Sequence, residues 1–259
     1  MKSSLKYFLI FITASSCSLK QNSPDVNLVN EQSPWYQGAL DSAIAIVNKS
    51  EESVAVISNT FDFPDNQEHY EIHLEFITLK NKKRYGKVNI TNANEVITAL
   101  FLIRKKGSTQ VIKSSHSTLT YMGDTIVDVN GDDLEDILIH WYPLSGCCRR
   151  NMYDVYLADV NGTFSPAYQF LNPTFSANEK IIRGVLYGHQ DEVGLYKYRW
   201  DSQRIDTVEF IYKNPKSAGG YIRTRKKFLD DADGDNKTYL GDLPEEYQSI
   251  EDIDWFMNK

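Results

Sequence analysis

Oxygen-bearing side chains recur at alternate positions in one short stretch of the chain, residues 128–136, which reads Asp-Val-Asn-Gly-Asp-Asp-Leu-Glu-Asp. Counted from the first Asp, they occupy positions 1, 3, 5 and 9. With this spacing, a tightly wound loop turns its oxygens toward one hard cation, and calcium is the ion such loops favour. The stretch therefore predicts a calcium site whose ligands are Asp128, Asn130, Asp132, the backbone carbonyl of Leu134, and Asp136.

The loop departs from the EF-hand pattern at two positions. Position 12 is Ile139 instead of the bidentate Glu, and position 6 is Asp133 instead of Gly. Asp tolerates the left-handed backbone conformation less well than Gly but better than most residues. The loop also runs directly into an apolar strand. These features predict a weakly bound calcium ion that acts as a structural clip, and the alternative is a solvated acidic turn without metal.

A second acidic stretch contains Asp231, Asp233 and Asp235, with Asp242 at position 12. The spacing fits a cation loop, but Gly stands at position 4 and Asn at position 6. A second metal site is one hypothesis for this stretch. An exposed acidic hairpin tip is the alternative that the pattern favours.

The amino end has a basic region, a short apolar region and small residues before Cys17. This order predicts a secretion signal over residues 1–16, which is too short to span a bilayer as a stable helix. A Cys directly after small residues resembles the bacterial lipoprotein signal, which implies that Cys17 carries lipid and attaches the chain to a membrane of the cell envelope, on the periplasmic side or the cell surface. An ordinary signal peptide that is cut nearby is the alternative.

Cys147 and Cys148 are adjacent, and they are the only other cysteines. If Cys17 is lipidated, these two can pair within the chain only with each other, in an oxidising compartment. Such a bond closes a small strained ring, and strained disulfides are more easily reduced. The pair is either a redox- or metal-sensitive loop tip or, as we favour, a structural kink that stiffens the loop.

The charge distribution argues against a nucleic-acid partner. Removal of residues 1–16 takes away two lysines and no acid, so the net charge changes from −7 to −9. Residues 230–259 contain ten acidic and two basic residues, so the remainder is close to neutral. A nucleic-acid partner would need a basic face, which this composition does not provide.

Hydrophobic periodicity predicts a mainly β chain with one short amino-terminal helix. Apolar residues recur at helical spacing within residues 34–49, and beyond residue 53 they alternate with a period of two. Turn signals every 8 to 12 residues or so favour an antiparallel meander that forms a sandwich, barrel or propeller-like sheet. The predicted organisation is a flexible spacer over residues 17–33, a β-rich region over 34–120, and a calcium-loop β domain over 121–259 with an acidic carboxyl-terminal segment.

The loop that leads into an apolar strand resembles the calcium loops of FG-GAP and VCBS repeat proteins, although it occurs once strongly and not as a tandem array. A longer part of the chain, residues 120–212, is similar to a family of bacterial calcium-loop lipoproteins. That resemblance implies a β-rich envelope lipoprotein. Some members of the family are periplasmic immunity proteins that inhibit lysozyme-like effectors delivered through type IV secretion. The similarity rests on Asp124, Ser145-Gly146, Tyr153-Asp-Val-Tyr-Leu157, Asn161-Gly-Thr-Phe164, Asn172-Pro-Thr-Phe175, Gly188 and Tyr196-Lys-Tyr-Arg-Trp-Asp201.

No Gly-x-Ser-x-Gly, His-Glu-x-x-His or phosphate-loop motif occurs in the sequence. The expected function is therefore non-enzymatic: an envelope lipoprotein that binds a protein partner, with a lysozyme-like wall hydrolase as the partner that the resemblance implies. Two alternatives remain: an unrecognised enzyme, which would need a pocket with convergent polar groups, and a surface carbohydrate-binding or adhesion module. The carbohydrate-binding module would use exposed aromatic side chains, for which the candidates are Trp35, Trp141, Tyr142 and Trp200.

Overall fold

The computed structural model describes residues 34–49, 56–63, 68–91, 96–104, 107–116, 118–144, 151–189, 192–216, 219–228 and 236–258. Strands make up 54% of the structure and helices 13%, which confirms the mainly β class. The three sheets are antiparallel, and the described strands do not close into a barrel. None of the described helices is long and apolar enough to span a bilayer.

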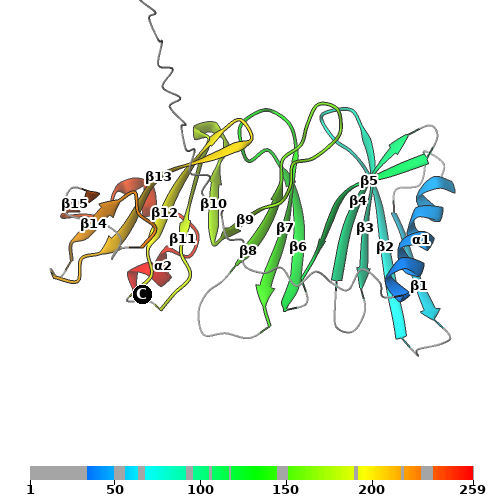
Figure 1. Ribbon diagram of the computed structural model, residues 1–259, viewed down its shortest axis with the longest axis horizontal. Coiled ribbons are helices and arrows are strands. Elements are labelled where there is room, and N and C mark those ends of the chain that lie inside the picture. The colour runs from blue at the N-terminus through cyan, green and yellow to red at the C-terminus, as the bar shows by residue number, and fades with distance from the viewer. Residues whose placement is uncertain are drawn as a thin grey trace, which may run out of the picture.

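Each sheet is a meander in which strands that follow one another in the chain also pair in space (Figure 1). The first sheet contains β1 (Val56–Phe63), β2 (Glu68–Thr78), β3 (Arg84–Thr91), β4 (Val96–Arg104) and β5 (Gly107–Ser115). The middle sheet contains β6 (Leu119–Val127), β7 (Asp136–Pro143), β8 (Met152–Tyr156) and β9 (Tyr168–Leu171). The third sheet contains β10 (Pro173–Ser176), β11 (Ile181–Val185), β12 (Leu195–Asp201), β13 (Arg204–Lys213), β14 (Tyr221–Thr224) and β15 (Thr238–Leu240).

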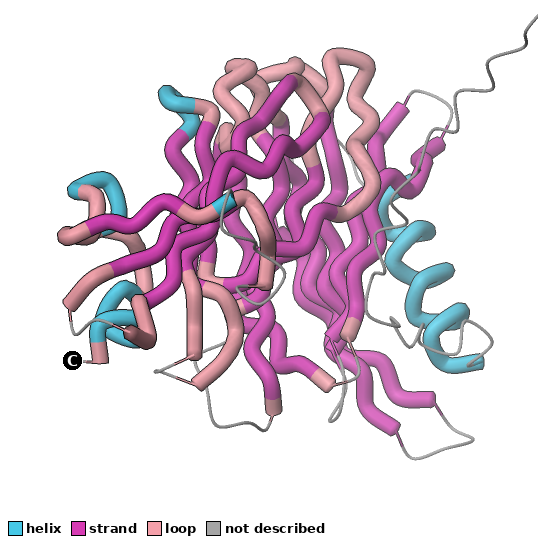
Figure 2. Tube along the Cα trace, turned by 60° about the vertical axis from the view of Figure 1, so that its left-hand side comes forward, coloured by secondary structure: helices cyan, strands magenta, loops and turns pink. Residues whose placement is uncertain are grey.

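The helix α1 (Pro34–Lys49) covers one face of the first sheet, as Figure 2 shows from the side. Its buried side chains Ala43 and Val47 pack with Ile72 and Val88 of that sheet. These helical positions are four apart and so lie on one face of the helix. The predicted helix over residues 34–49 is therefore confirmed with the same bounds.

The middle sheet packs between the other two sheets. On one face, Ile139 and Trp141 join a core with Tyr85 and Leu100 of the first sheet. On the opposite face, Leu138 joins a core that belongs mainly to the third sheet. Successive side chains of a strand point to opposite faces, so a strand covered on both sides must be apolar at consecutive positions. This arrangement accounts for the continuous apolar run in β7.

The outer face of the third sheet is covered by the carboxyl-terminal segment, which contains the 3₁₀ helix η4 (Glu245–Tyr247) and the helix α2 (Ile253–Met257). Tyr247 and Phe256 are fully buried and pack against Leu195 and Ile211. The fold is thus a stack of α1, three sheets and a carboxyl-terminal cover.

Four strands were not predicted from the pattern, namely β6, β9, β10 and β15. β9, β10 and β15 are three or four residues long, which is too short for a clear alternation of apolar and polar residues. In β6, Gly123 and Asp124 interrupt the alternation. The predicted boundary between residues 120 and 121 falls inside β6. Side chains from both sides of that boundary share the core between the first and middle sheets.

Candidate functional site

The acidic loop connects β6 to β7 at one end of the middle sheet. Gly131 has a φ of +73°, and a Cβ there would lie 2.3 Å from the Ala177 carbonyl oxygen. On another side of the loop, the backbone N–H of Lys80 donates to the Glu135 carboxylate at 2.7 Å. The loop is thereby held against the turn between β2 and β3 and against the segment between β10 and β11.

The first part of the loop is wound around the carboxylate of Asp128. Its Oδ1 accepts the backbone N–H of Gly131 at 2.7 Å and that of Asn130 at 3.2 Å, and its Oδ2 accepts the N–H of Asp133 at 2.9 Å. Asp133 has a φ of 68°, so position 6 does adopt the left-handed conformation. Asp133 thus takes the conformation that Gly usually supplies at position 6 of an EF-hand loop.

Asn130 and Asp132 continue the same local pattern. The Asn130 Oδ1 accepts the N–H of Asp132 at 3.1 Å, and Asp132 Oδ1 accepts the N–H of Leu134 at 2.9 Å. The Asn130 amide also donates to Asp132 Oδ2 at 3.0 Å. Asn130 and Asp132, like Asp128, therefore bind N–H groups of the loop itself, and their role as cation ligands stays a prediction.

Asp136 is the last predicted ligand of the loop and the first residue of β7, and it is completely buried. Its Oδ2 accepts the N–H of Val129 at 3.0 Å and its Oδ1 accepts the N–H of Ala158 at 2.8 Å. Burial raises the pKa of the Asp136 carboxyl to about 7, the two backbone donors oppose that shift, and the charges of Asp132 and Asp128 add to it. A nearby cation would favour the charged form of this carboxyl.

The donor set of the loop fits calcium by type, because it consists of carboxylate and amide oxygens. As it stands, however, Asp128 directs both oxygens to the loop's own N–H groups. Among the described residues, no three His, Cys, Asp or Glu side chains form a group arranged to hold a metal ion. Calcium at this loop remains a prediction.

Several other predicted sites lie outside the described residues. These are the second acidic stretch with Asp231, Asp233 and Asp235, the lipidation site Cys17, and the pair Cys147 and Cys148.

The aromatic residues considered for glycan binding divide into two groups. Trp141 and Trp200 are buried, with exposed fractions of 0% and 2%. Tyr142 is partly exposed at 37%, and nothing is described for the side chain of Trp35. Two of the four candidates are therefore core residues, which cannot stack on a sugar from solvent.

The most highly connected buried carboxylate was not anticipated from the sequence. Asp154 on β8 is 2% exposed, and its Oδ2 accepts hydrogen bonds from Ser114 Oγ at 2.6 Å and Trp141 Nε1 at 3.1 Å. His116 Nε2 lies 2.8 Å from the same oxygen, and Gln169 donates to Oδ1 at 3.0 Å. One signal was present in the sequence: a single Asp inside the otherwise apolar and aromatic run of residues 152–157.

Burial disfavours the carboxylate form of Asp154, but the hydrogen bond and charge of His116, with the hydrogen bonds from Ser114 and Gln169, outweigh burial, so the pKa of Asp154 lies below its ordinary value. Ser, His and Asp meet here, yet the arrangement differs from a catalytic triad. In a triad the His stands between the Ser and the Asp and takes the proton of the Ser. Ser114 and His116 instead bind the same oxygen of Asp154, so this cluster ties the first sheet to the middle sheet.

A second polar cluster joins the same two sheets. Lys87 Nζ on β3 lies 2.6 Å from Asp124 Oδ2 on β6 and 3.0 Å from Glu75 Oε2 on β2. Tyr121 donates to the same Asp124 carboxylate and accepts from Asn89 at 3.2 Å. Burial disfavours the charged form of Lys87, but the two carboxylates outweigh burial and raise its pKa.

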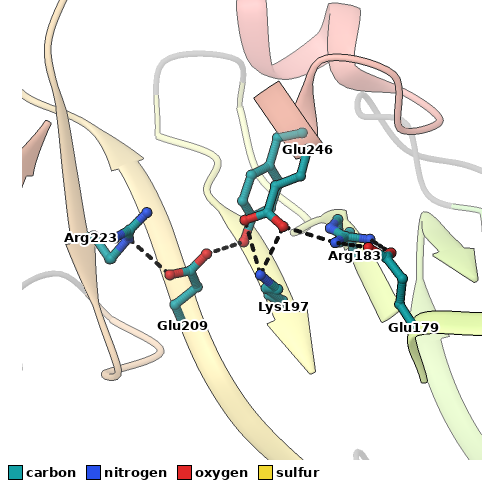
Figure 3. Close-up of polar contacts among 7 residues, drawn as sticks. Glu179, Arg183, Lys197, Glu209, Arg223 and Glu246 are labelled. Atoms are coloured by element: carbon teal, nitrogen blue, oxygen red, sulfur yellow. Dashed lines mark hydrogen bonds and ion pairs between the residues drawn. The ribbon is translucent and has the colours of Figure 1, made fainter. Parts of the chain in front are cut away.

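The third sheet carries a row of alternating charges on its outer face (Figure 3). Lys197 bridges both oxygens of Glu246 at 2.9 Å, and Arg183 donates to Glu246 at 2.9 Å and to Glu179 at 2.6 Å. Because Glu246 belongs to η4, these pairs hold the carboxyl-terminal segment on the sheet.

Glu209 extends the row and accepts from the Tyr247 hydroxyl at 2.9 Å. Its other oxygen lies 2.9 Å from Arg223 Nε. A shallow pocket of about 240 Å³ opens beside these residues, between Thr224, Arg225 and Thr238. The carboxylate in the pocket is thus already engaged by structural partners.

In comparisons with known proteins, no family model, no curated protein and no solved structure matches this chain.

Proposed function

We propose that this chain is a non-enzymatic protein of a bacterial cell envelope that acts by binding another protein. The observation that carries the non-enzymatic part is the sharing of one Asp154 oxygen by Ser114 and His116. A serine nucleophile needs a base within hydrogen-bond reach of its hydroxyl. Here the Ser114 hydroxyl donates to a buried carboxylate that also accepts from Trp141 and pairs with His116, and the lowered pKa of Asp154 makes this carboxylate a weak base.

The proposed location at a membrane of the cell envelope rests on the amino-terminal sequence. A lipid on Cys17 would tether the fold to a membrane without burying any part of the fold in it. Replacement of Cys17 by Ser in the full chain tests this directly. The expected result is loss of radiolabelled palmitate incorporation and release of the protein from the membrane fraction, whereas retention of label by Cys17→Ser would refute lipidation at this residue.

The proposed partner is a lysozyme-like wall hydrolase, and the support for it is the resemblance of residues 120–212 to envelope lipoproteins that include inhibitors of such enzymes. The purified chain, added in increasing amounts to a muramidase assay, should lower the rate of cell-wall hydrolysis and should bind the enzyme in a pull-down. Failure to bind any lysozyme-like enzyme tested would contradict this partner. Retention of the chain on immobilised glycans, in the absence of enzyme binding, would favour the carbohydrate-binding alternative.

Calcium has a structural role in this proposal. Asp128, Asn130 and Asp132 would hold the ion together with Asp136 and the carbonyl of Leu134. If the three carboxylates turned toward one ion, its positive charge would offset their mutual repulsion, because like charges about 4 Å apart repel by roughly 1 kcal/mol per pair even in water. Its effect would be to fix where β7 enters the middle sheet.

A further inference from the structure

The outer edge of β6 is a place where the middle sheet could be extended. β6 is the edge strand of its sheet, and among the described residues no strand pairs with its free side. Met122 and Val127 on this strand are 55% and 42% exposed. This edge strand of nine residues has no Lys or Pro, and it carries two of the features that natural proteins use to limit further strand pairing, a bulge near Met122 and the inward charge of Asp124. The Asp124 charge is neutralised by Lys87 at 2.6 Å, so it does not by itself repel a basic segment.

The stacking of the two sheets defines what lies beneath that free edge. β6 sits over β3, as the contact of Asp124 with Lys87 at 2.6 Å shows, and β8 sits over β5, as the contact of Asp154 with Ser114 at 2.6 Å shows. β7 therefore lies over β4. Strands in a sheet are spaced about 4.8 Å apart, so one more strand beside β6 would lie over β2.

The surface of β2 below this position is acidic. Glu71 and His73 are exposed there, and the Glu75 side chain is 38% exposed. These three residues alternate with Ile72 and Leu74, which are buried beneath α1, so they point toward the middle-sheet side. Lys87 offsets part of the charge, since it pairs with Glu75 and Asp124. The shelf formed by Glu71, His73 and Glu75 thus retains net negative charge.

We propose that an extended, basic segment of a partner protein binds here by adding a strand to β6. The backbone of the segment would pair with the free edge of β6, and every second side chain, a Lys or Arg, would face the acidic shelf. The remaining side chains would lie on the side of Met122 and Val127. This inference rests on the proposed protein-binding function and names its surface and the chemistry of the partner.

A second copy of the chain fits this position less well. If β6 paired with β6 of another copy, the inward side chain of Asp124 from that copy would be placed over the shelf that contains Glu75. Like charges placed opposite one another destabilise strand pairing. The charge pattern therefore favours a basic partner over self-association.

The test uses the full chain and two synthetic peptides of about ten residues, long enough to pair along all of β6. One peptide alternates Lys with Val and the other alternates Glu with Val. The Lys peptide should bind and slow amide hydrogen exchange within residues 119–127, while the Glu peptide should not bind. Binding of both peptides alike, or protection confined to other strands, would overturn the proposal.

Charge variants sharpen the test. Glu71→Lys should weaken Lys-peptide binding by about tenfold, because like charge is introduced next to the partner. The matched control is Asp206→Lys, which makes the same change of charge at an exposed position on β13. This variant should bind the Lys peptide as the wild type does. Equal binding by Glu71→Lys and the wild type would count against the site. Concentration-dependent dimerisation that protects residues 119–127 would assign the edge to a second copy and would also refute it.

The same variants separate this proposal from the function on which it rests. If Glu71→Lys still binds a lysozyme-like enzyme as tightly as the wild type does, the protein-binding role stands and the β6 site is wrong. If no enzyme binds while the peptide results hold, the inhibitor function fails and the β6 site stands.

Discussion

Asp154 and His116 pair across the interface between the first and middle sheets, with 2.8 Å between Oδ2 and Nε2, although they lie 38 residues apart in the chain. Ser114 and Trp141 donate to the same oxygen. One carboxylate therefore connects β5, β7 and β8.

Removal of this carboxylate should strongly destabilise the fold. We expect Asp154→Ala to lower the free energy of unfolding by about 3–5 kcal/mol, because several buried donors lose their acceptor and a buried pair is broken. Urea denaturation followed by circular dichroism measures the change. Asp206→Ala, at an exposed position, is the control and should change stability by less than about 0.5 kcal/mol.

The stabilising effect of the Asp154 carboxylate should decrease as the pH is lowered. The pKa of Asp154 in the folded chain lies below its ordinary value of 3.8, so its carboxylate stabilises the fold above that pH, and the contribution is lost as pH falls below it. The stability difference between the wild type and Asp154→Asn should therefore be largest near pH 7 and should shrink toward pH 3. A difference that stays constant over this range would contradict the assignment.

Calcium should raise the melting temperature if it binds the acidic loop. A ligand that binds only the folded chain at ten times its Kd adds about 1.4 kcal/mol of stability. Differential scanning calorimetry with calcium and with chelator should show this shift in the wild type, and Asp128→Ala should abolish it. Asp133→Asn removes a carboxylate from a position that is not a predicted ligand, so its calcium response should persist. An unchanged wild-type melting curve would rule out the clip.

Gly131 tests how tightly the loop is seated. A Cβ at this position would lie 2.3 Å from the Ala177 carbonyl oxygen, so Gly131→Ala should cost about 2 kcal/mol or more. Gly219 has a similar positive φ of +86° but open space around it. Gly219→Ala should therefore cost only about 1 kcal/mol from backbone strain. Equal losses in the two variants would show that the contact with Ala177 is unimportant.

Tyr247 secures the carboxyl-terminal cover. It is fully buried and its hydroxyl donates to Glu209 at 2.9 Å. Tyr247→Phe leaves that oxygen without its donor and should lower stability by about 2 kcal/mol. Tyr239, which is 64% exposed, provides the control, because Tyr239→Phe should leave chemical denaturation unchanged. A neutral Tyr247→Phe variant would mean that water satisfies Glu209 equally well.

Local features of the fold could be predicted from the sequence because their contacts are local. The donors to Asp128 come from residues no more than five positions away, so the spacing of Asp and Asn in the loop was sufficient to predict its winding. α1 was predicted with its observed bounds because its apolar positions recur at helical spacing. The strand β6 was missed, since most of its side chains are only partly covered and its pattern is not clearly apolar.

The Asp154 cluster and the free edge of β6 were decided only by the tertiary structure. Ser114, His116 and Asp154 come together because sheets of unequal width stack with β8 over β5, and no sequence spacing encodes that register. The same stacking leaves Glu71 and Glu75 beyond the cover of the middle sheet. The sequence by itself determined the acidic loop, the helix and the alternation of the longer strands. Packing between the sheets decided which polar side chains became buried partners and which stayed exposed to solvent.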